Sequence, residues 1–405
     1  MFPVSCYNTY ILDHDSHKPA ILGGKPIFDE PIAFNQPTLP PYETLSAEFA
    51  EIIACGQLTN GANVARFEAE AAERFGRPAV AVSCCTSGLI LAEKTLGLTG
   101  QVILPSFTFF ATSHSLLWNR LEPLFVDIDA DSWNIDPRAV EAAINPKVTA
   151  ILAVDVFGNP GDKDALTEIA GRYGLKLITD SAHGIGGAYK GRPTGSFGVA
   201  EVFSLSPTKV ATAGEGGLIG VDSEELADRL RIARDYGNPG DYDCRFVGLN
   251  ARMPEMNAVL GIASLEMLDE NVRRRNDIAG AYRSNLIDLP GLTWQRIDTE
   301  SLCAYKDISV LVDPQAFGLD RDDLASALAA EGIPTRKYYW PPAHRQTAYS
   351  GLVSVAGDLE VTDKVSANIL SLPIFSHMKE ADVERICRAV KLIHRQSAAI
   401  GASSK

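Results

Sequence analysis

The first half of the chain alternates between short apolar runs and longer segments in which apolar residues recur with helical spacing. The runs have the length of strands and are apolar nearly throughout, which is typical of strands buried on both faces. They cover residues 79–83, 101–105, 122–127, 150–156, 175–180, 201–205 and 217–221. Helices are expected before and between them, over residues 42–53, 64–75, 89–96, 111–118 and 163–173. This order predicts an α/β fold, a mainly parallel mixed sheet covered by helices on both faces.

Turn and cap residues mark the ends of some of these helices. Gln57–Gly61 has the composition of a turn, and Asn63 is expected to cap the helix that follows it. Later in the chain the pattern changes, and one long helix is expected from Met253 to Tyr282. A second module follows, with a strand at 308–312 and helices at 321–331 and 381–395.

The chain has 405 residues, enough for two domains and a large core. Residues 1–40 are rich in Pro, Gly and polar groups, which favours an arm draped over the body or a partner subunit. We predict an N-terminal arm at residues 1–24, a large domain at residues 25–275 and a smaller α+β domain at residues 276–405.

Composition and charge narrow the classes of function. The net charge of −14 argues against nucleic acid or an anionic membrane surface as a partner, so acidic substrates would need a local basic pocket. No segment has the uninterrupted apolar length of a membrane helix, and the first 19 residues do not form a signal peptide. The seven cysteines form no regular framework, which indicates reduced thiols and a cytoplasmic protein. We expect no metal site.

One segment has the pattern of an anion site. The expected strand at 79–83 is followed by Cys84–Gly88, a tight turn of small residues, and then by the helix at 89–96. A strand, a small-residue turn and a helix in this order place backbone N–H groups and hydroxyls at a helix N-terminus. Such a terminus is suited to phosphate.

The segment Phe203–Gly217 holds Lys209 between a hydroxyl-bearing run and a glycine cluster. A lysine in such a turn is commonly a solvated loop residue. The functional interpretation is an amine that forms a Schiff base with a cofactor aldehyde, with Ser204 supplying a phosphate-binding hydroxyl. Asp180 ends an expected strand, where it either caps the next turn or contacts a ligand at the carboxyl edge of the sheet.

Taken together, these segments resemble the DegT/StrS-type sugar aminotransferases, which are fold-type I enzymes dependent on pyridoxal 5′-phosphate. The motifs that carry the resemblance are Ser83–Gly88, Pro105–Phe109, Asp180–His183, Ser204–Gly217, Gly248–Glu255, Tyr338–His344 and Ser371–Pro373. Within the family, further segments resemble the 4-aminotransferases that act on dTDP-4-keto-6-deoxyglucose. These segments are Gly23–Pro26, Gly97–Val102, Trp118 and Asp127–Asp129.

The resemblance implies a role for each matching residue. Lys209 would hold the cofactor and move protons, and Asp180 would keep the ring nitrogen protonated. His183 would approach the ring hydroxyl and Phe109 would stack on the ring, although a lone histidine is as often structural and such a phenylalanine is usually core. The residues implied for the phosphate are Thr86, Ser87, Ser204 and, from the neighbouring subunit of a homodimer, Asn250.

The implied reaction is a ping-pong transamination. Glutamate would leave its amino group as pyridoxamine 5′-phosphate, which would aminate a nucleotide-linked keto sugar, expected to be a dTDP-4-keto-6-deoxyhexose. Relatives that dehydrate carry histidine in place of the lysine, so Lys209 favours amino transfer. The alternatives are a 3-keto sugar, a keto-cyclitol or a natural-product carbonyl as substrate, or a regulatory protein that binds the cofactor without turnover.

Overall fold

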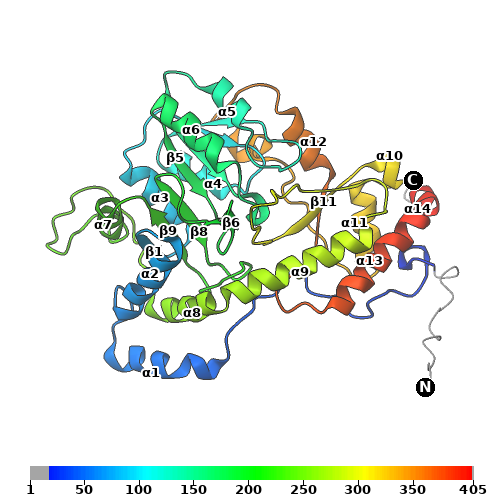
Figure 1. Ribbon diagram of the computed structural model, residues 1–405, viewed down its shortest axis with the longest axis horizontal. Coiled ribbons are helices and arrows are strands. Elements are labelled where there is room, and N and C mark those ends of the chain that lie inside the picture. Colours follow the sequence, from blue (N-terminus) through cyan, green and yellow to red (C-terminus); the bar gives the residue numbers. More distant parts are fainter. Residues whose placement is uncertain (1–17, 404–405) are drawn as a thin grey trace, which may run out of the picture.

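The computed structural model describes residues 18–403, arranged as a larger unit with a central sheet and a smaller unit beside it (Figure 1). Residues 1–17, most of the expected arm, lie outside the described residues. Among the residues that are described, no helix combines the length and the apolar character needed to cross a membrane.

The central sheet has eight strands in the order β1-β9-β8-β5-β4-β2-β3-β12. Its strands are β1 (Ala79–Val82), β2 (Gln101–Pro105), β3 (Glu122–Val126), β4 (Val148–Val154), β5 (Lys176–Asp180), β8 (Ala200–Ser204), β9 (Gly217–Val221) and β12 (Ser354–Val355). β9 is antiparallel to both of its neighbours and the other pairs are parallel. The predicted α/β fold with a mainly parallel mixed sheet is confirmed.

Helices cover both faces of this sheet, as the apolar strands require. Val80 and Val82 of β1 point to the face that packs against α3 (Cys85–Thr95) and α7 (Glu224–Ala233). Ala79 and Ala81 point to the other face and pack against α2 (Ala62–Phe75) and α8 (Glu255–Glu266). The remaining helices of the larger unit are α1 (Ser46–Cys55), α4 (Ala111–Trp118), α5 (Pro137–Ala143) and α6 (Lys163–Tyr173).

The smaller unit is built on an antiparallel sheet of three strands, β10 (Leu292–Trp294), β11 (Ile308–Val312) and β13 (Ile369–Leu372). Its helices are α9 (Leu268–Leu286), α10 (Pro314–Phe317), α11 (Arg321–Ala330), α12 (Glu360–Asn368), α13 (Glu380–Arg395) and α14 (Ser397–Ser403). The hydrophobic core of this unit is formed by the three strands together with α9, α11 and α13. Figure 1 shows α9 extending from the larger unit along the smaller one.

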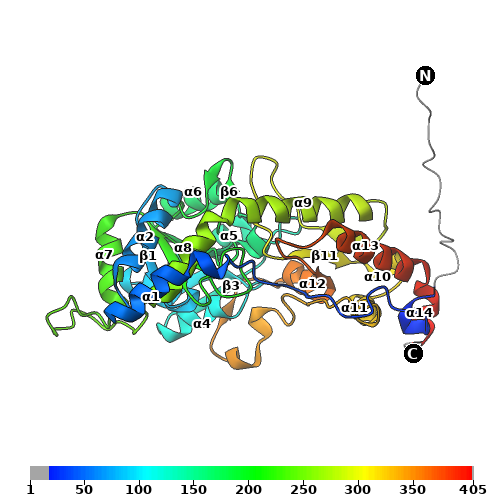
Figure 2. The same cartoon turned by 90° about the horizontal axis from the view of Figure 1, so that it is seen from below.

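Two segments cross between the units. Phe28 is buried in the core of the smaller unit, and its N–H donates to the carbonyl of Glu331 at 3.1 Å. From there the chain runs along the molecule to α1 (Figure 2). In the opposite direction, β12 leaves the smaller unit and pairs in parallel with β3. The first part of the range predicted for the large domain therefore packs on the small one.

The predicted cap of α2 is wrong. The helix begins at Ala62 with Gly61 at the N-cap, and the Asn63 side chain does not cap it. Instead the Glu255 carboxylate accepts the N–H groups of Gly61 at 2.7 Å, Asn63 at 2.8 Å and Val64 at 3.2 Å. A carboxylate at a helix N-terminus satisfies unpaired donors and favours the helix dipole. A residue distant in sequence thus replaces the local cap.

Two other helix predictions also need correction. The single helix expected from Met253 to about Tyr282 is divided into α8 and α9 at Met267, whose φ of −88° and ψ of −7° depart from ideal α-helical values. The residues expected as the turn Cys84–Gly88 are mostly the first turn of α3, which begins at Cys85. Small residues are compatible with either a turn or a helix, and here tertiary packing selects the helix.

A buried ionic network lies under the carboxyl ends of β4 and β5. Lys163 is 1% exposed, and its Nζ lies 2.9 Å from Asp155 Oδ1 and 3.1 Å from Glu201 Oε1. Ser181 donates its hydroxyl to Asp155, whose own N–H donates to the carbonyl of Asp180 at 3.1 Å. The network therefore ties two strand ends together beside Asp180.

Replacing Lys163 with Ala should destabilise the protein strongly, because it leaves the buried Asp155 carboxylate without its cation and Glu201 with only the more distant Arg77, at 3.8 Å. We expect a loss of about 3–5 kcal/mol in the free energy of unfolding, measured by urea denaturation. The matched control is Arg172→Ala, which removes a half-exposed cation from surface pairs with Glu141 and Glu168 and should leave the free energy of unfolding close to that of the wild type. Equal losses in the two variants would contradict this account of the network.

Candidate active site

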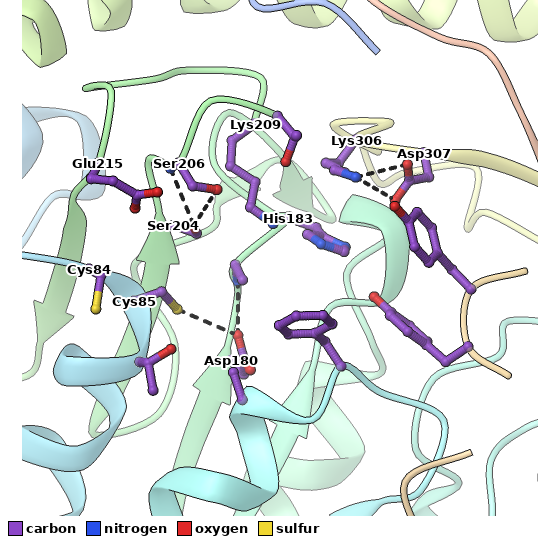
Figure 3. A pocket seen from close by; sticks show the side chains of 17 residues that line it. Cys84, Cys85, Asp180, His183, Ser204, Ser206, Lys209, Glu215, Lys306 and Asp307 are labelled. Atoms are coloured by element: carbon purple, nitrogen blue, oxygen red, sulfur yellow. Dashed lines mark hydrogen bonds and ion pairs between the residues drawn. The ribbon is translucent and has the colours of Figure 1, made fainter. Parts of the chain in front are cut away.

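A cavity of about 350 Å³ opens where the carboxyl ends of β5 and β8 face the smaller unit. Most of the predicted site residues line it, and Figure 3 shows their side chains converging on it. The predicted residues in the lining are Thr86, Phe109, Asp180, His183, Ser204 and Lys209.

Asp180 is the last residue of β5 and is only 4% exposed. Thr112 donates its hydroxyl to Oδ2 at 2.7 Å, and the N–H of Ala182 donates to Oδ1 at 3.1 Å. Burial raises the pKa of this carboxyl above its usual range, although these hydrogen bonds and the charge of Lys209 oppose the rise. No Lys, Arg or His within residues 18–403 forms an ion pair with it. The site therefore presents a buried carboxylate suited to a cationic ligand group.

Lys209 follows β8 in a loop whose turn is closed by the Lys209 N–H bonding to the carbonyl of Ser206 at 3.0 Å. Its side chain enters the cavity (Figure 3). Burial and the positive charge of Lys306 lower the pKa of the amine to about 8. A substantial fraction of the amine is then neutral near physiological pH, which is the form that attacks a carbonyl group.

One side of the cavity is suited to an anion. Thr86 lies in the first turn of α3, beside the N-cap residue Cys84, and Ser204 stands at the end of β8. Ser204 Oγ accepts the N–H of Ser206 at 3.4 Å. A helix N-terminus and hydroxyls meet here, which is an arrangement that binds phosphate. Figure 3 shows Ser204 and Cys84 apart from the Lys306 side of the cavity.

Two predicted residues do not line the cavity. The Ser87 hydroxyl belongs to a capping box with Cys84, donating to the Cys84 carbonyl at 2.8 Å and lying 3.1 Å from Ser83 Oγ. Asn250 is exposed and forms an isolated antiparallel bridge with Asp235. The geometry within one subunit thus assigns neither side chain to the site.

His183 and Phe109 form part of the wall. Burial and the positive charges of Lys209 and Lys306 hold the pKa of His183 well below its ordinary value, so the imidazole is neutral. Its ring stacks on Phe157, with centroids 6.4 Å apart and planes 13° from parallel. Phe109 is 46% exposed and therefore not a core residue, so its ring remains available to a ligand.

The smaller unit completes the cavity with residues that the sequence analysis did not assign to the site. They are Lys306, Asp307, Tyr338 and Tyr339. The two tyrosines belong to a motif that resembled the family, which was the available signal. Lys306 and Asp307 precede an ordinary strand, and nothing in their local pattern indicated that they would face Lys209.

The arrangement could hold a molecule with a phosphate, a cationic ring and a carbonyl group. The phosphate would meet the N-terminus of α3 and Ser204, the cationic ring would meet Asp180, and the carbonyl group would meet Lys209. In the described part of the chain, no group of three or more His, Cys, Asp or Glu residues is placed to hold a metal ion.

Comparisons with known proteins agree with this geometry. The sequence model of the DegT/DnrJ/EryC1/StrS aminotransferase family matches residues 42–391. A dTDP-4-amino-4,6-dideoxy-D-glucose transaminase of Escherichia coli is 33% identical over 366 residues, covering 89% of this chain and 98% of the relative. A dTDP-3-amino-3,4,6-trideoxy-alpha-D-glucose transaminase of Streptomyces venezuelae is 34% identical over 358 residues, covering 86% and 93%. A crystal structure of DesI with its TDP-sugar product superposes with a TM-score of 0.89 at 36% identity, covering 95% and 98%.

The lowered pKa of Lys209 predicts unusual reactivity. In the folded protein, freed of bound small molecules, acetylation of Lys209 should reach half its maximal rate at about pH 8, because the neutral amine reacts. In the unfolded chain the midpoint should return to about 10.4, so that at pH 8 the neutral fraction is roughly a hundredfold smaller. Peptide mass spectrometry after pulse labelling measures the midpoint in the folded and in the unfolded protein. A folded-state midpoint near 10 would contradict the shift.

Proposed function

Because the chain belongs to the DegT/DnrJ/EryC1/StrS aminotransferase family, we propose that it transfers an amino group from glutamate to a nucleotide-linked keto sugar. The family match and the relatives confirm the predicted family, its α/β fold and the expectation that the chain is an enzyme, a transaminase. The observation that carries the proposal is the meeting of Lys209 and Asp180 in one cavity.

The cavity residues fit pyridoxal 5′-phosphate as cofactor. A buried carboxylate without a cationic partner matches the ring nitrogen, and the hydroxyls of Thr86 and Ser204 match the phosphate. When bound, the cofactor supplies an aldehyde and a ring that accepts electrons. Phe109 and the neutral His183 would orient the ring, by stacking and by a hydrogen bond.

The protein's own contribution is to hold charge and move protons. The Thr112 hydroxyl fixes the direction of the Asp180 carboxylate, which would hold its negative charge toward the cationic ring of the bound cofactor. Lys209 Nζ, with a pKa of about 8, can release a proton and take one back at similar free-energy cost. Tyr338 and Tyr339 close the smaller-unit side of the cavity and limit the access of water.

For the substrate we propose a dTDP-4-keto-6-deoxyhexose. The Escherichia coli relative bears a name that places its amino group at carbon 4 of a dTDP-linked dideoxyglucose. The Streptomyces venezuelae relative, similar to nearly the same degree, is named for an amino group at carbon 3. A 3-keto sugar is therefore the second candidate, and the overall identity does not choose between them.

The function predicts amination of dTDP-4-keto-6-deoxyglucose when the purified enzyme is incubated with glutamate. The position of the new amine is identified by NMR, with a 3-keto isomer tested in parallel. Lys209→Ala should reduce turnover by about two to four orders of magnitude, because the proton carrier is lost. Lys364→Ala, at an exposed lysine outside the cavity, should retain the turnover of the wild type. No amination of any keto sugar in such a panel would contradict the proposal.

We also propose that the enzyme is a homodimer in which Asn250 completes the partner's site. Asn250 is exposed and lies outside the cavity of its own subunit. Close to it in the chain, Val247 is 77% exposed, and it lines a surface hollow together with Trp118, which is 78% exposed. Exposed apolar side chains gathered in this way favour an interface. A two-fold interface would let each subunit lend Asn250 to the other.

A subunit-mixing experiment tests this sharing. Asn250→Asp places a negative charge against the phosphate, so its homodimer should be nearly inactive, as should that of Lys209→Ala. In a mixed dimer, one site combines the intact Lys209 of one chain with the intact Asn250 of the other. Reassociating the two inactive proteins should therefore restore a substantial part of the activity. Mixed dimers that form by mass spectrometry but remain inactive would refute the sharing.

A further inference from the structure

Lys306 and Asp307 form a buried ion pair in the cavity wall contributed by the smaller unit. They are 5% and 1% exposed, and Lys306 Nζ lies 2.9 Å and 3.0 Å from the two carboxylate oxygens of Asp307. The ammonium also lies over the ring of Tyr338, 5.3 Å from its centroid. Figure 3 shows the pair on the opposite side of the cavity from Ser204 and Cys84. It is thus separate from the groups suited to phosphate.

Contacts to the backbone fix the position of Lys306. Its N–H donates to the carbonyl of Phe157 at 3.0 Å, and the buried Arg275 donates from Nη1 to the carbonyls of Tyr305 at 3.0 Å and Lys306 at 3.2 Å. Tyr305 has a φ of +47° and Phe157 a φ of +60°, both in the left-handed region. Such strained residues persist where the surrounding structure holds them, and they cluster at functional sites.

Charge gives Lys306 a specific importance. Among the described residues that line this cavity, the cationic side chains are Lys209 and Lys306, since His183 is neutral. The whole chain carries a net charge of −14, so an anionic substrate depends on local positive charge. Lys209 is committed to proton transfer. The positive charge of Lys306 is one cause of the lowered pKa of Lys209, which means that the two amines interact electrostatically across the cavity.

We propose that Lys306 binds the α-carboxylate of the amino donor. This inference rests on the proposed function, since it takes glutamate or another amino acid as the donor. The α-carboxylate sits on the same carbon as the reacting amino group, so it must lie close to Lys209 when that group reacts. The diphosphate of a nucleotide sugar is attached at carbon 1, across the sugar ring from a carbonyl at carbon 4, and belongs farther from the reacting atoms.

Asp307 has a complementary role in this arrangement. It neutralises Lys306 when no donor is bound, which lowers the cost of keeping an ammonium in a buried position. An incoming carboxylate replaces or shares this contact, so Asp307 competes with the donor. Removing the negative charge of Asp307 should then strengthen donor binding, whereas a purely structural pair would be weakened by the same change.

The first test compares two ligands in wild type and Lys306→Met, using the purified holoenzyme without keto sugar. Glutamate and its α-amide, which lacks the α-carboxylate charge, are titrated while the absorbance of the bound cofactor is followed. Lys306→Met should raise the half-saturating glutamate concentration roughly tenfold to a hundredfold, since a hydrogen bond between charged groups is lost. It should leave the half-saturating concentration of the amide unchanged. Lys306→Arg should recover part of the loss.

Binding without turnover gives a second measurement. Calorimetric titration with 2-oxoglutarate, the keto acid that glutamate leaves behind, should show weaker affinity in Lys306→Met and tighter affinity in Asp307→Asn. The double variant Lys306→Met/Asp307→Asn removes the pair without leaving a buried charge and should bind as weakly as Lys306→Met. The matched control is Lys337→Met, a cation paired with Asp322 outside the cavity lining, which should bind normally.

Two outcomes would overturn the inference. One is an equal loss for glutamate and its α-amide. The other is unchanged 2-oxoglutarate affinity in the folded double variant combined with weaker binding of dTDP, which would assign Lys306 to the nucleotide diphosphate. Either result leaves the proposed function standing if keto-sugar amination by the wild type persists. Absence of amination with any donor would instead refute the proposed function.

Discussion

The site depends on a carboxylate that is buried without a cation. Asp180 accepts hydrogen bonds from the Thr112 hydroxyl and the N–H of Ala182, with a longer one from the Cys85 thiol, and its pKa is raised because these do not fully replace water. A buried charge of this kind costs stability in the free protein, and it is tolerated where a ligand supplies the opposite charge. The cavity around it is therefore arranged for a partner that the polypeptide itself does not provide.

A neighbouring buried ionic network helps to hold the Asp180 carboxylate in place. The Asp155–Lys163–Glu201 network is satisfied internally, and it reaches Asp180 through the backbone bond from Asp155. Two buried ionic groups thus lie beside each other with different roles. The network is paired and rigid, while Asp180 is unpaired and faces the cavity.

The sequence predicted the parts of the fold and site that local pattern determines. The strands that surround Asp180 and Lys209 were found because they are short, mainly apolar and separated by helices of about a dozen residues. Glu255 could not be recognised as the cap of α2, because the contact joins residues far apart in the chain. Lys306 was missed for the same reason, since its place in the cavity results from the packing of the smaller unit against the larger. The break at Met267 also has no local breaker such as Pro or Gly.

The pairing of β12 with β3 has a consequence for how the chain can be divided. Without Ser354–Val355, β3 would become an edge strand with unpaired backbone groups, and the apolar cluster that includes Ala343 and Tyr349 would lose part of its cover. In the other direction, the smaller unit needs Phe28 from the start of the chain. A cut between residues 275 and 276 would therefore expose unpaired backbone groups or apolar surface on both pieces. The two units are interleaved, and neither can be exchanged between relatives as an independent module.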